Sequence, residues 1–169
     1  MNKSDSYIES EASQSGTRAV SVPSPLAAFQ SAAWACAHTL LENIMYIQKE
    51  LPTLDLAEAQ RSAIVQICST LVGTKHDVVS ELFDLQDIEG AAGPDVIQKR
   101  IERIVQMVIE DLTQLHEVVQ SLESAIASDR RVGLAYLLVA ESATNMLRSF
   151  VEMRDAADRY GKEIAKDAP

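Results

Sequence analysis

The sequence predicts an all-α protein, an antiparallel up-down four-helix bundle with long helices and a disordered N-terminal tail. Three observations support this fold class. Apolar residues recur every three or four positions through most of residues 23–169, which is the period of an amphipathic helix. The predicted helices are long and joined by short connections, which makes consecutive helices antiparallel neighbours. No stretch alternates apolar and polar residues with period two, so no sheet is expected.

The tail and the bundle differ in composition. Residues 1–22 are rich in Ser, Glu and Asp and poor in aliphatic residues, so they cannot bury enough apolar surface to offset the entropy lost on ordering. A tail that acts as an export or docking signal stays open. Residues 23–169 form the predicted bundle domain. Because the N-terminus lacks a basic region followed by an apolar core, we expect a cytoplasmic protein, with export by a signal-peptide-independent route left open.

The first predicted helix begins at Ser24 and Pro25, a good N-cap followed by the residue favoured at the first helical position. It continues to about Leu51 and stops at Pro52. The positions that form its core stripe alternate by three and four: Leu26, Phe29, Ala33, Cys36, Leu40, Ile44, Ile47 and Leu51.

The second predicted helix begins at Asp55, where Glu58 three residues later resembles a capping box. Its apolar spacing stays in phase across Gly73, which favours one long helix over two short ones. The third begins at Pro94, after the strong break at Gly90–Pro94.

The fourth predicted helix begins at Val132 and alternates apolar residues by four and three up to Ile164. A strict period of 3.5 residues is the pattern of a coiled-coil seam.

Several kinds of chemistry lack the residues they need. We expect no metal, because the predicted hairpin register separates His38, His76 and His116 by more than about 10 Å along the helices. Cys36 and Cys68 match in level across the first turn and could face one another, but two small core residues are expected in a reducing compartment. We expect no cofactor and no catalytic residues, because neither a nucleophile elbow nor a phosphate-binding loop is present.

Two groups of apolar residues exceed what one core stripe needs. These candidate partner-binding residues are Trp34, Leu41 and Met45 in the first helix and Leu134, Leu137 and Leu138 in the fourth. One interpretation, which we favour, is that the first and fourth helices pack together through them within the chain. The other is an exposed patch that binds a partner or a second copy.

The function expected from these features is non-enzymatic: an interaction or assembly protein, such as an adaptor, a chaperone, an immunity-type inhibitor or a self-associating subunit. We expect a protein partner or a homo-oligomer. The net charge of −10 argues against nucleic acid and against anionic membranes. The alternative is a small enzyme or ligand-binding bundle with a pocket between its helices, for which Tyr136, Tyr160, His116 and Trp34 are the first residues to inspect.

Overall fold

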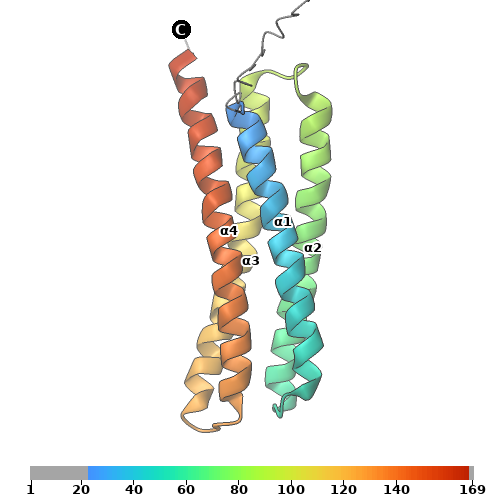
Figure 1. Ribbon diagram of the computed structural model, residues 1–169, viewed down its shortest axis with the longest axis vertical. Coiled ribbons are helices and arrows are strands. Elements are labelled where there is room, and N and C mark those ends of the chain that lie inside the picture. The colour runs from blue at the N-terminus through green and yellow to red at the C-terminus, as the bar shows by residue number, and fades with distance from the viewer. Residues whose placement is uncertain (1–22, 168–169) are drawn as a thin grey trace, which may run out of the picture.

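The computed structural model describes residues 23–167, which form four long helices and one short 3-10 turn. In chain order these are α1 (Pro25–Glu50), η1 (Leu51–Thr53), α2 (Glu58–Ile88), α3 (Pro94–Ile126) and α4 (Val132–Asp167). Successive helices run in opposite directions, each packs against the next, and α4 closes the ring against α1 (Figure 1). The described part of the chain contains no strand. The predicted all-α, antiparallel up-down four-helix bundle is therefore confirmed, while the predicted tail, residues 1–22, lies outside the described residues.

The start of α1 follows the sequence signals. The Oγ of Ser24 accepts a hydrogen bond from the N–H of Ala27 at 3.2 Å, which satisfies one of the free donors of the first turn. Pro25 takes the first helical position, where its missing N–H costs nothing. Pro94 and Val132 begin α3 and α4 at the predicted residues.

The predicted start of α2 at Asp55 is wrong. The helix begins at Glu58, because the 3-10 turn is followed by an extended Leu54 with φ −90° and ψ 136°. The N–H of Ala57 donates to Oε1 of Gln60 at 3.2 Å. The connection between α1 and α2 is consequently longer than the sequence suggested, which shifts the register of the two helices.

Two side chains hold the connections at one end of the bundle. Arg61 donates to the backbone carbonyls of Leu51 and Leu54, at 2.9 and 2.7 Å. Arg131 donates to Asp55 at 3.1 Å and to Asp129 at 2.8 Å, so the connection after α1 is joined to the turn after α3. Hydrogen bonds from the Arg131 side chain and backbone lower the pKa of Asp129.

Glycine has two different roles in this bundle. α2 passes through Gly73 as one continuous helix, which confirms the prediction of one long helix. Gly90 has a φ of +84°, the left-handed conformation that glycine adopts without strain, and it ends α2 and reverses the chain toward α3.

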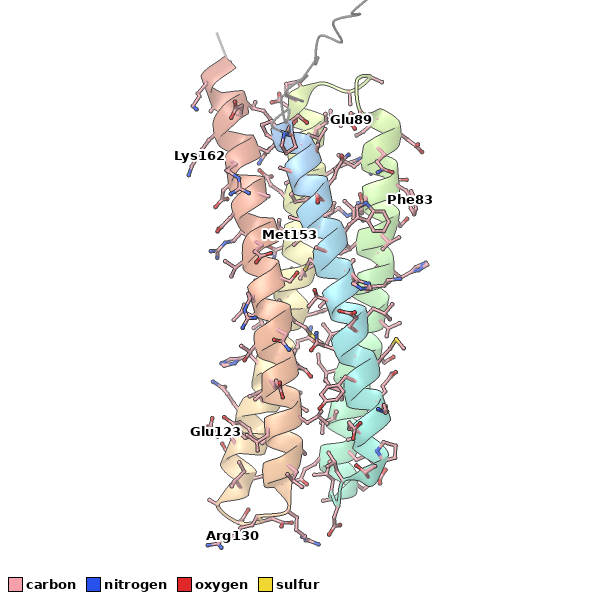
Figure 2. The ribbon with its side chains drawn as sticks, viewed as in Figure 1. Phe83, Glu89, Glu123, Arg130, Met153 and Lys162 are labelled. Atoms are coloured by element: carbon pink, nitrogen blue, oxygen red, sulfur yellow. The ribbon has the colours of Figure 1, made fainter. Side chains whose placement is uncertain are left out.

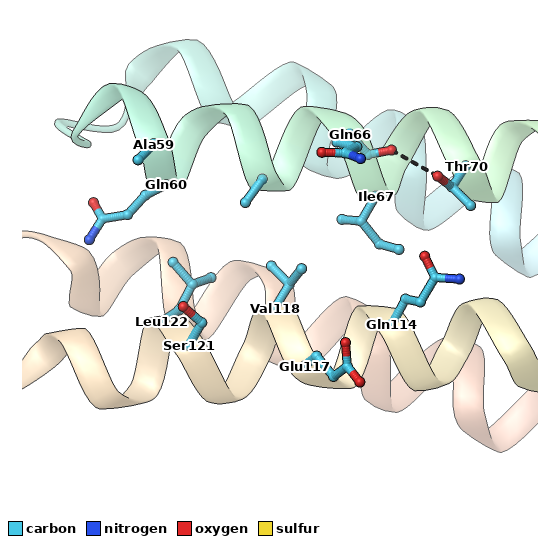
Figure 3. Close-up of a pocket in the computed structure, with 11 residues that line it drawn as sticks. Ala59, Gln60, Gln66, Ile67, Thr70, Gln114, Glu117, Val118, Ser121 and Leu122 are labelled. Carbon is cyan, nitrogen blue, oxygen red and sulfur yellow. Dashed lines mark hydrogen bonds between the residues drawn. The ribbon is translucent and has the colours of Figure 1, made fainter.

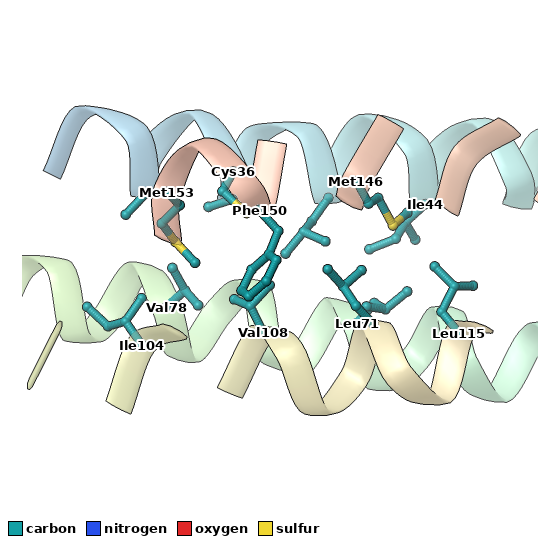
Figure 4. Close-up of a cluster of buried hydrophobic side chains, with 14 of the residues drawn as sticks. Cys36, Ile44, Leu71, Val78, Ile104, Val108, Leu115, Met146, Phe150 and Met153 are labelled. Atoms are coloured by element: carbon teal, nitrogen blue, oxygen red, sulfur yellow. The ribbon is translucent and has the colours of Figure 1, made fainter. Parts of the chain in front are cut away.

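The core is filled by aliphatic side chains and two phenylalanines (Figure 4). All eight residues of the stripe predicted for α1 are buried. In Figure 4, Phe150 of α4 points toward Val108 on α3. On α4 seven of the ten predicted seam residues are buried, but Tyr136, Ala143 and Ile164 are only partly buried, and Ala135 and Ser142 are fully buried beside the seam. A helix of 3.6 residues per turn drifts away from a strict 3.5-residue repeat, and α4 packs against both α1 and α3.

Candidate protein-binding surface

The six candidate residues do not form one surface. Trp34 packs edge to face against Phe83 of α2, with ring centroids 5.4 Å apart and ring planes at 77°. Leu41 and Met45 follow Trp34 at intervals of seven and four residues, which keeps them on the same side of the helix. The Trp34, Leu41 and Met45 side of α1 therefore borders α2.

The interface between α1 and α4 uses a different side of α1. Asn145 of α4 donates to Oδ1 of Asn43 at 3.4 Å, and Asn43 lies about 160° around α1 from Met45, at about 100° per residue. The expectation that α1 and α4 pack together through the six candidates is therefore wrong for the α1 residues.

The three leucines of α4 are divided between core and surface. Leu138 is 8% exposed and belongs to the core, whereas Leu134 and Leu137 are 68% and 61% exposed. Leu138 comes three residues after the buried Ala135 and four before the buried Ser142, so it shares their side of the helix. Leu137 points away from the core. Leu138 is thus removed from the candidate binding residues, and Leu134 and Leu137 stay on a separate part of the surface.

A second apolar stripe on α2 was missed in the sequence. Its residues follow at intervals of seven, seven and four, which places them on one side of the helix, and they are Val65, Val72, Val79 and Phe83. Phe83 and Val65 are 54% and 53% exposed. The sequence contains this stripe as a second series of positions spaced by four and three, in which Ser69 and His76 occupy the positions between the apolar residues. It is distinct from the core stripe through Leu71, Val78 and Leu82.

The stripes of α1 and α2 lie side by side. Figure 2 shows the Phe83 ring on the near side of the molecule, directed toward α1. Met45 lies eleven residues after Trp34 on α1, and Val72 lies eleven residues before Phe83 on α2. Because the two helices are antiparallel and Trp34 contacts Phe83, Met45 and Val72 lie at the same height along the bundle axis. We call the combined surface the α1–α2 strip; its members are Trp34, Leu41, Met45, Val65, Val72, Val79 and Phe83. It is about 27 Å long at 1.5 Å per residue.

The α1–α2 strip lies in a part of the molecule that is poor in carboxylates. α1 has no charged residue from Pro25 to Leu41, and α2 has no Asp or Glu from Ala59 to His76. Two acidic residues of the second half of α2 lie toward α3, where Glu81 and Asp84 pair with Arg100 at 2.9 and 3.2 Å. The seven residues of the strip are uncharged in a chain of net charge −10.

The histidine register predicted from the sequence is wrong for one pair. His38 is four residues along α1 from Trp34, and His76 is seven residues back along α2 from Phe83. Since the Trp34–Phe83 contact aligns the two helices, these histidines lie within about 5 Å of the same level. The later start of α2, three residues beyond the predicted one, accounts for part of the difference. Nε2 of His38 lies 3.1 Å from Oε1 of Glu42.

His116 lies apart from that pair, on α3 beside Gln120. Among residues 23–167, no three His, Cys, Asp or Glu side chains gather closely enough to hold a metal ion.

The two cysteines are free and buried, and they are not level with one another. Cys36 lies two residues beyond Trp34 and hydrogen-bonds to Ser149 of α4. Cys68 lies fifteen residues before Phe83, so the two thiols are separated by more than about 10 Å along the helices. The predicted match in level is wrong, and the longer connection accounts for part of the offset. Burial raises the pKa of each thiol to about 11.

Four grooves of the bundle are lined by none of the residues proposed for a pocket, which are Tyr136, Tyr160, His116 and Trp34. A groove of about 410 Å³ between α2 and α3 has one carboxylate, Glu117, beside three glutamines, two hydroxyl side chains and five apolar side chains (Figure 3). The tyrosines proposed for a pocket, Tyr136 and Tyr160, are about 36 Å apart along α4. Burial raises the pKa of Tyr160. Neither tyrosine lines the α2–α3 groove, and neither do His116 and Trp34.

No helix among residues 23–167 combines the length and the apolar character needed to cross a membrane. Comparisons of the chain with protein-family models, with curated proteins and with solved structures find no match.

Proposed function

We propose that this protein acts by binding other helical proteins and is not an enzyme. It would serve as an adaptor, a chaperone, an immunity-type inhibitor or a self-associating subunit. The observation that carries this proposal is the α1–α2 strip, in which aromatic and aliphatic side chains remain exposed beside a core that is already filled. The two buried thiols suit a reducing compartment, which favours the cytoplasm.

The energetics of the strip favour a protein partner. Met45 is 59% exposed and Phe83 is 54% exposed, and burying apolar surface stabilises a complex by about 25 cal/mol per Å². Trp is among the residues that most often dominate binding energy at interfaces. Trp34 and Phe83 already hold one another in place, so little side-chain entropy is lost when a partner covers them.

The shape of the strip favours a helix as the binding element. Each side of the strip follows a four-and-three series, which is the spacing that helices present to one another in bundles and coiled coils. A length of about 27 Å matches about 18 helical residues. A partner helix lying between α1 and α2 would meet Trp34 and Phe83 near one end, Met45 and Val72 near the middle, and Val65 at the other end.

A photo-cross-linking experiment tests this proposal. A photoreactive amino acid is placed at Met45 in the strip and, as a control, at Gln106, which is exposed on α3. Irradiation in a lysate of the native host should give a discrete cross-linked protein from position 45 and not from position 106. The adduct should disappear when Val72→Lys is added, because the charge cannot be buried in the complex. Equal labelling from both positions, or an adduct that persists with Val72→Lys, would refute binding through the strip.

A further inference from the structure

We infer that the groove between α2 and α3 binds an amphipathic helix of another protein, and that this helix carries lysine or arginine beside its apolar side. The groove is a different surface from the α1–α2 strip. Ala63 and Thr70 line it, whereas Val65 and Val72 of the strip each come two residues later, about 160° around α2 at about 100° per residue. The inference therefore goes beyond the proposed function and does not depend on it.

The groove has an apolar floor and one low wall. Figure 3 shows Ile67 of α2 and Val118 and Leu122 of α3 in the space between the two helices. On the wall formed by α2, Ala59 and Ala63 are exposed and four residues apart, so they lie on the same side of the helix. Because their side chains are small, the backbone of another helix can approach closely there.

Carboxylates lie along both edges of the groove. Glu117 lines it on α3, and Glu110, seven residues earlier, is on the same side of that helix. On α2, Asp77 comes seven residues after Thr70 and lies on the same side as that lining residue. All three carboxylates are on exposed residues, so a partner in the groove meets three negative charges.

The cations of this region do not neutralise these edges. α3 has no Lys or Arg from Gln106 to Ile126. Arg61 of α2 donates to the backbone carbonyls of the α1–α2 connection, and Lys75 lies about 140° around α2 from Thr70. Arg103, seven residues before Glu110, is paired with Glu81 at 3.3 Å. The charge that complements the groove is consequently positive.

The spacing of the carboxylates favours a helix as the occupant. Glu110 and Glu117 are about 10.5 Å apart along α3, which matches lysines or arginines seven residues apart on a helix lying beside it. In an extended segment, two cations about 10 Å apart are three residues apart and point to opposite sides. From Ala59 to Asp77 the edge on α2 is about 27 Å long, which corresponds to a helix of about 18 residues.

The first experiment measures binding of a labelled synthetic peptide to the full-length protein by fluorescence anisotropy. The peptide has about 18 residues, with leucines at a helical spacing of three and four and lysines seven residues apart. The parent should bind it and should not bind the same peptide with glutamate in place of lysine. Ala63→Arg should abolish binding, whereas Ser62→Arg, at the exposed neighbouring position outside the groove, should bind like the parent. Equal binding of both peptides, or equal loss in both variants, would overturn the inference.

The second experiment separates the groove from a general attraction between a basic peptide and an acidic protein. The double variant Glu110→Gln, Glu117→Gln should bind the lysine peptide about fivefold more weakly at low salt, because two surface ion pairs are lost. This difference should shrink as salt is added. The control is the double variant Glu123→Gln, Glu141→Gln, which changes the net charge equally at exposed positions outside the groove. Equal weakening in the two double variants would show a general attraction and contradict the inference.

The third experiment tells the groove apart from the α1–α2 strip. Val72→Lys should bind the lysine peptide like the parent, and circular dichroism should show that it and the Ala63→Arg variant remain folded. Ala63→Arg should leave labelling from the photoreactive residue at Met45 unchanged, so each surface can fail without the other. Loss of the peptide in Val72→Lys with binding retained in Ala63→Arg would place the peptide on the strip and overturn the inference.

Discussion

The rings of Trp34 and Phe83 meet edge to face on the outside of the bundle, with centroids 5.4 Å apart. Aromatic pairs of this geometry contribute about 0.5–1.5 kcal/mol beyond the area they bury. A double-mutant cycle with Trp34→Leu and Phe83→Leu should therefore give a coupling energy in that range. The free energy of unfolding of the four proteins, measured by urea denaturation under conditions where the protein is monomeric, provides the check. Strictly additive effects would show that the rings do not hold one another in solution.

Leu71 and Leu115 lie in the core, on α2 and α3. Truncation of either to alanine should lower the free energy of unfolding by about 2–5 kcal/mol, because the cavity cannot fully collapse. Val65→Ala, at an exposed position of α2, is the control and should cost less than about 1 kcal/mol. Denaturant midpoints give the values. Equal losses at Leu71 and Val65 would contradict the distinction between the core stripe and the α1–α2 strip.

Gly73 and Gly90 should respond in opposite ways to substitution by alanine. A Cβ at Gly73 would meet nothing within 4 Å, so Gly73→Ala should raise the free energy of unfolding by about 0.5–1 kcal/mol in the middle of a helix. Gly90→Ala should lower it by about 1–2 kcal/mol, because a side chain opposes the φ of +84° there. Thermal and urea denaturation of the two variants measure the difference. A gain at both positions would argue against the left-handed turn.

Burial of Cys36 and Cys68 should make the stability depend on alkaline pH. Both thiols have a pKa of about 11 in the folded protein, against 9.0 as the ordinary value. Below pH 9 both states carry protonated thiols, so the contribution to stability is fully present. Between pH 9 and 11 the unfolded chain ionises first, and the free energy of unfolding falls.

The matched comparison for the alkaline dependence is the Cys36→Ala, Cys68→Ala double variant, which should lose this part of the slope. A thiol reagent should label the native parent only after unfolding, as a direct check on burial. An identical slope in parent and variant between pH 9 and 11 would contradict the pKa shift.

Helical periodicity was sufficient to predict the fold. The apolar stripes of α1, α2 and α3 identify the core, because residues spaced three or four apart lie on the same side of a helix with 3.6 residues per turn. The register between helices was harder to predict, since it depends on the length of the connection. The extended Leu54 delayed α2 to Glu58, which contributed to the wrong levels predicted for His38, His76 and the two cysteines.

The surface was predicted only in part, for a related reason. The sequence shows that Trp34, Leu41 and Met45 lie beside the core stripe of α1. It does not show whether that side of α1 faces α2 or α4, because this depends on the order of the helices around the bundle. Val72 and Phe83 were overlooked because a core stripe through Leu71 and Leu82 already accounted for α2. The position of Leu138 depended on whether Ala135 or Tyr136 faces the core, and small residues such as alanine give a weak periodic signal.

Trp34 is the only tryptophan of the chain and lies within the α1–α2 strip, so its fluorescence reports directly whether the strip becomes covered. The decisive measurement is acrylamide quenching of Trp34 fluorescence before and after addition of the protein recovered by cross-linking from Met45. The quenching constant should fall as the complex forms and should stay at its starting value in Val72→Lys. Binding accompanied by unchanged quenching of Trp34 would contradict the claim that the strip is the binding surface.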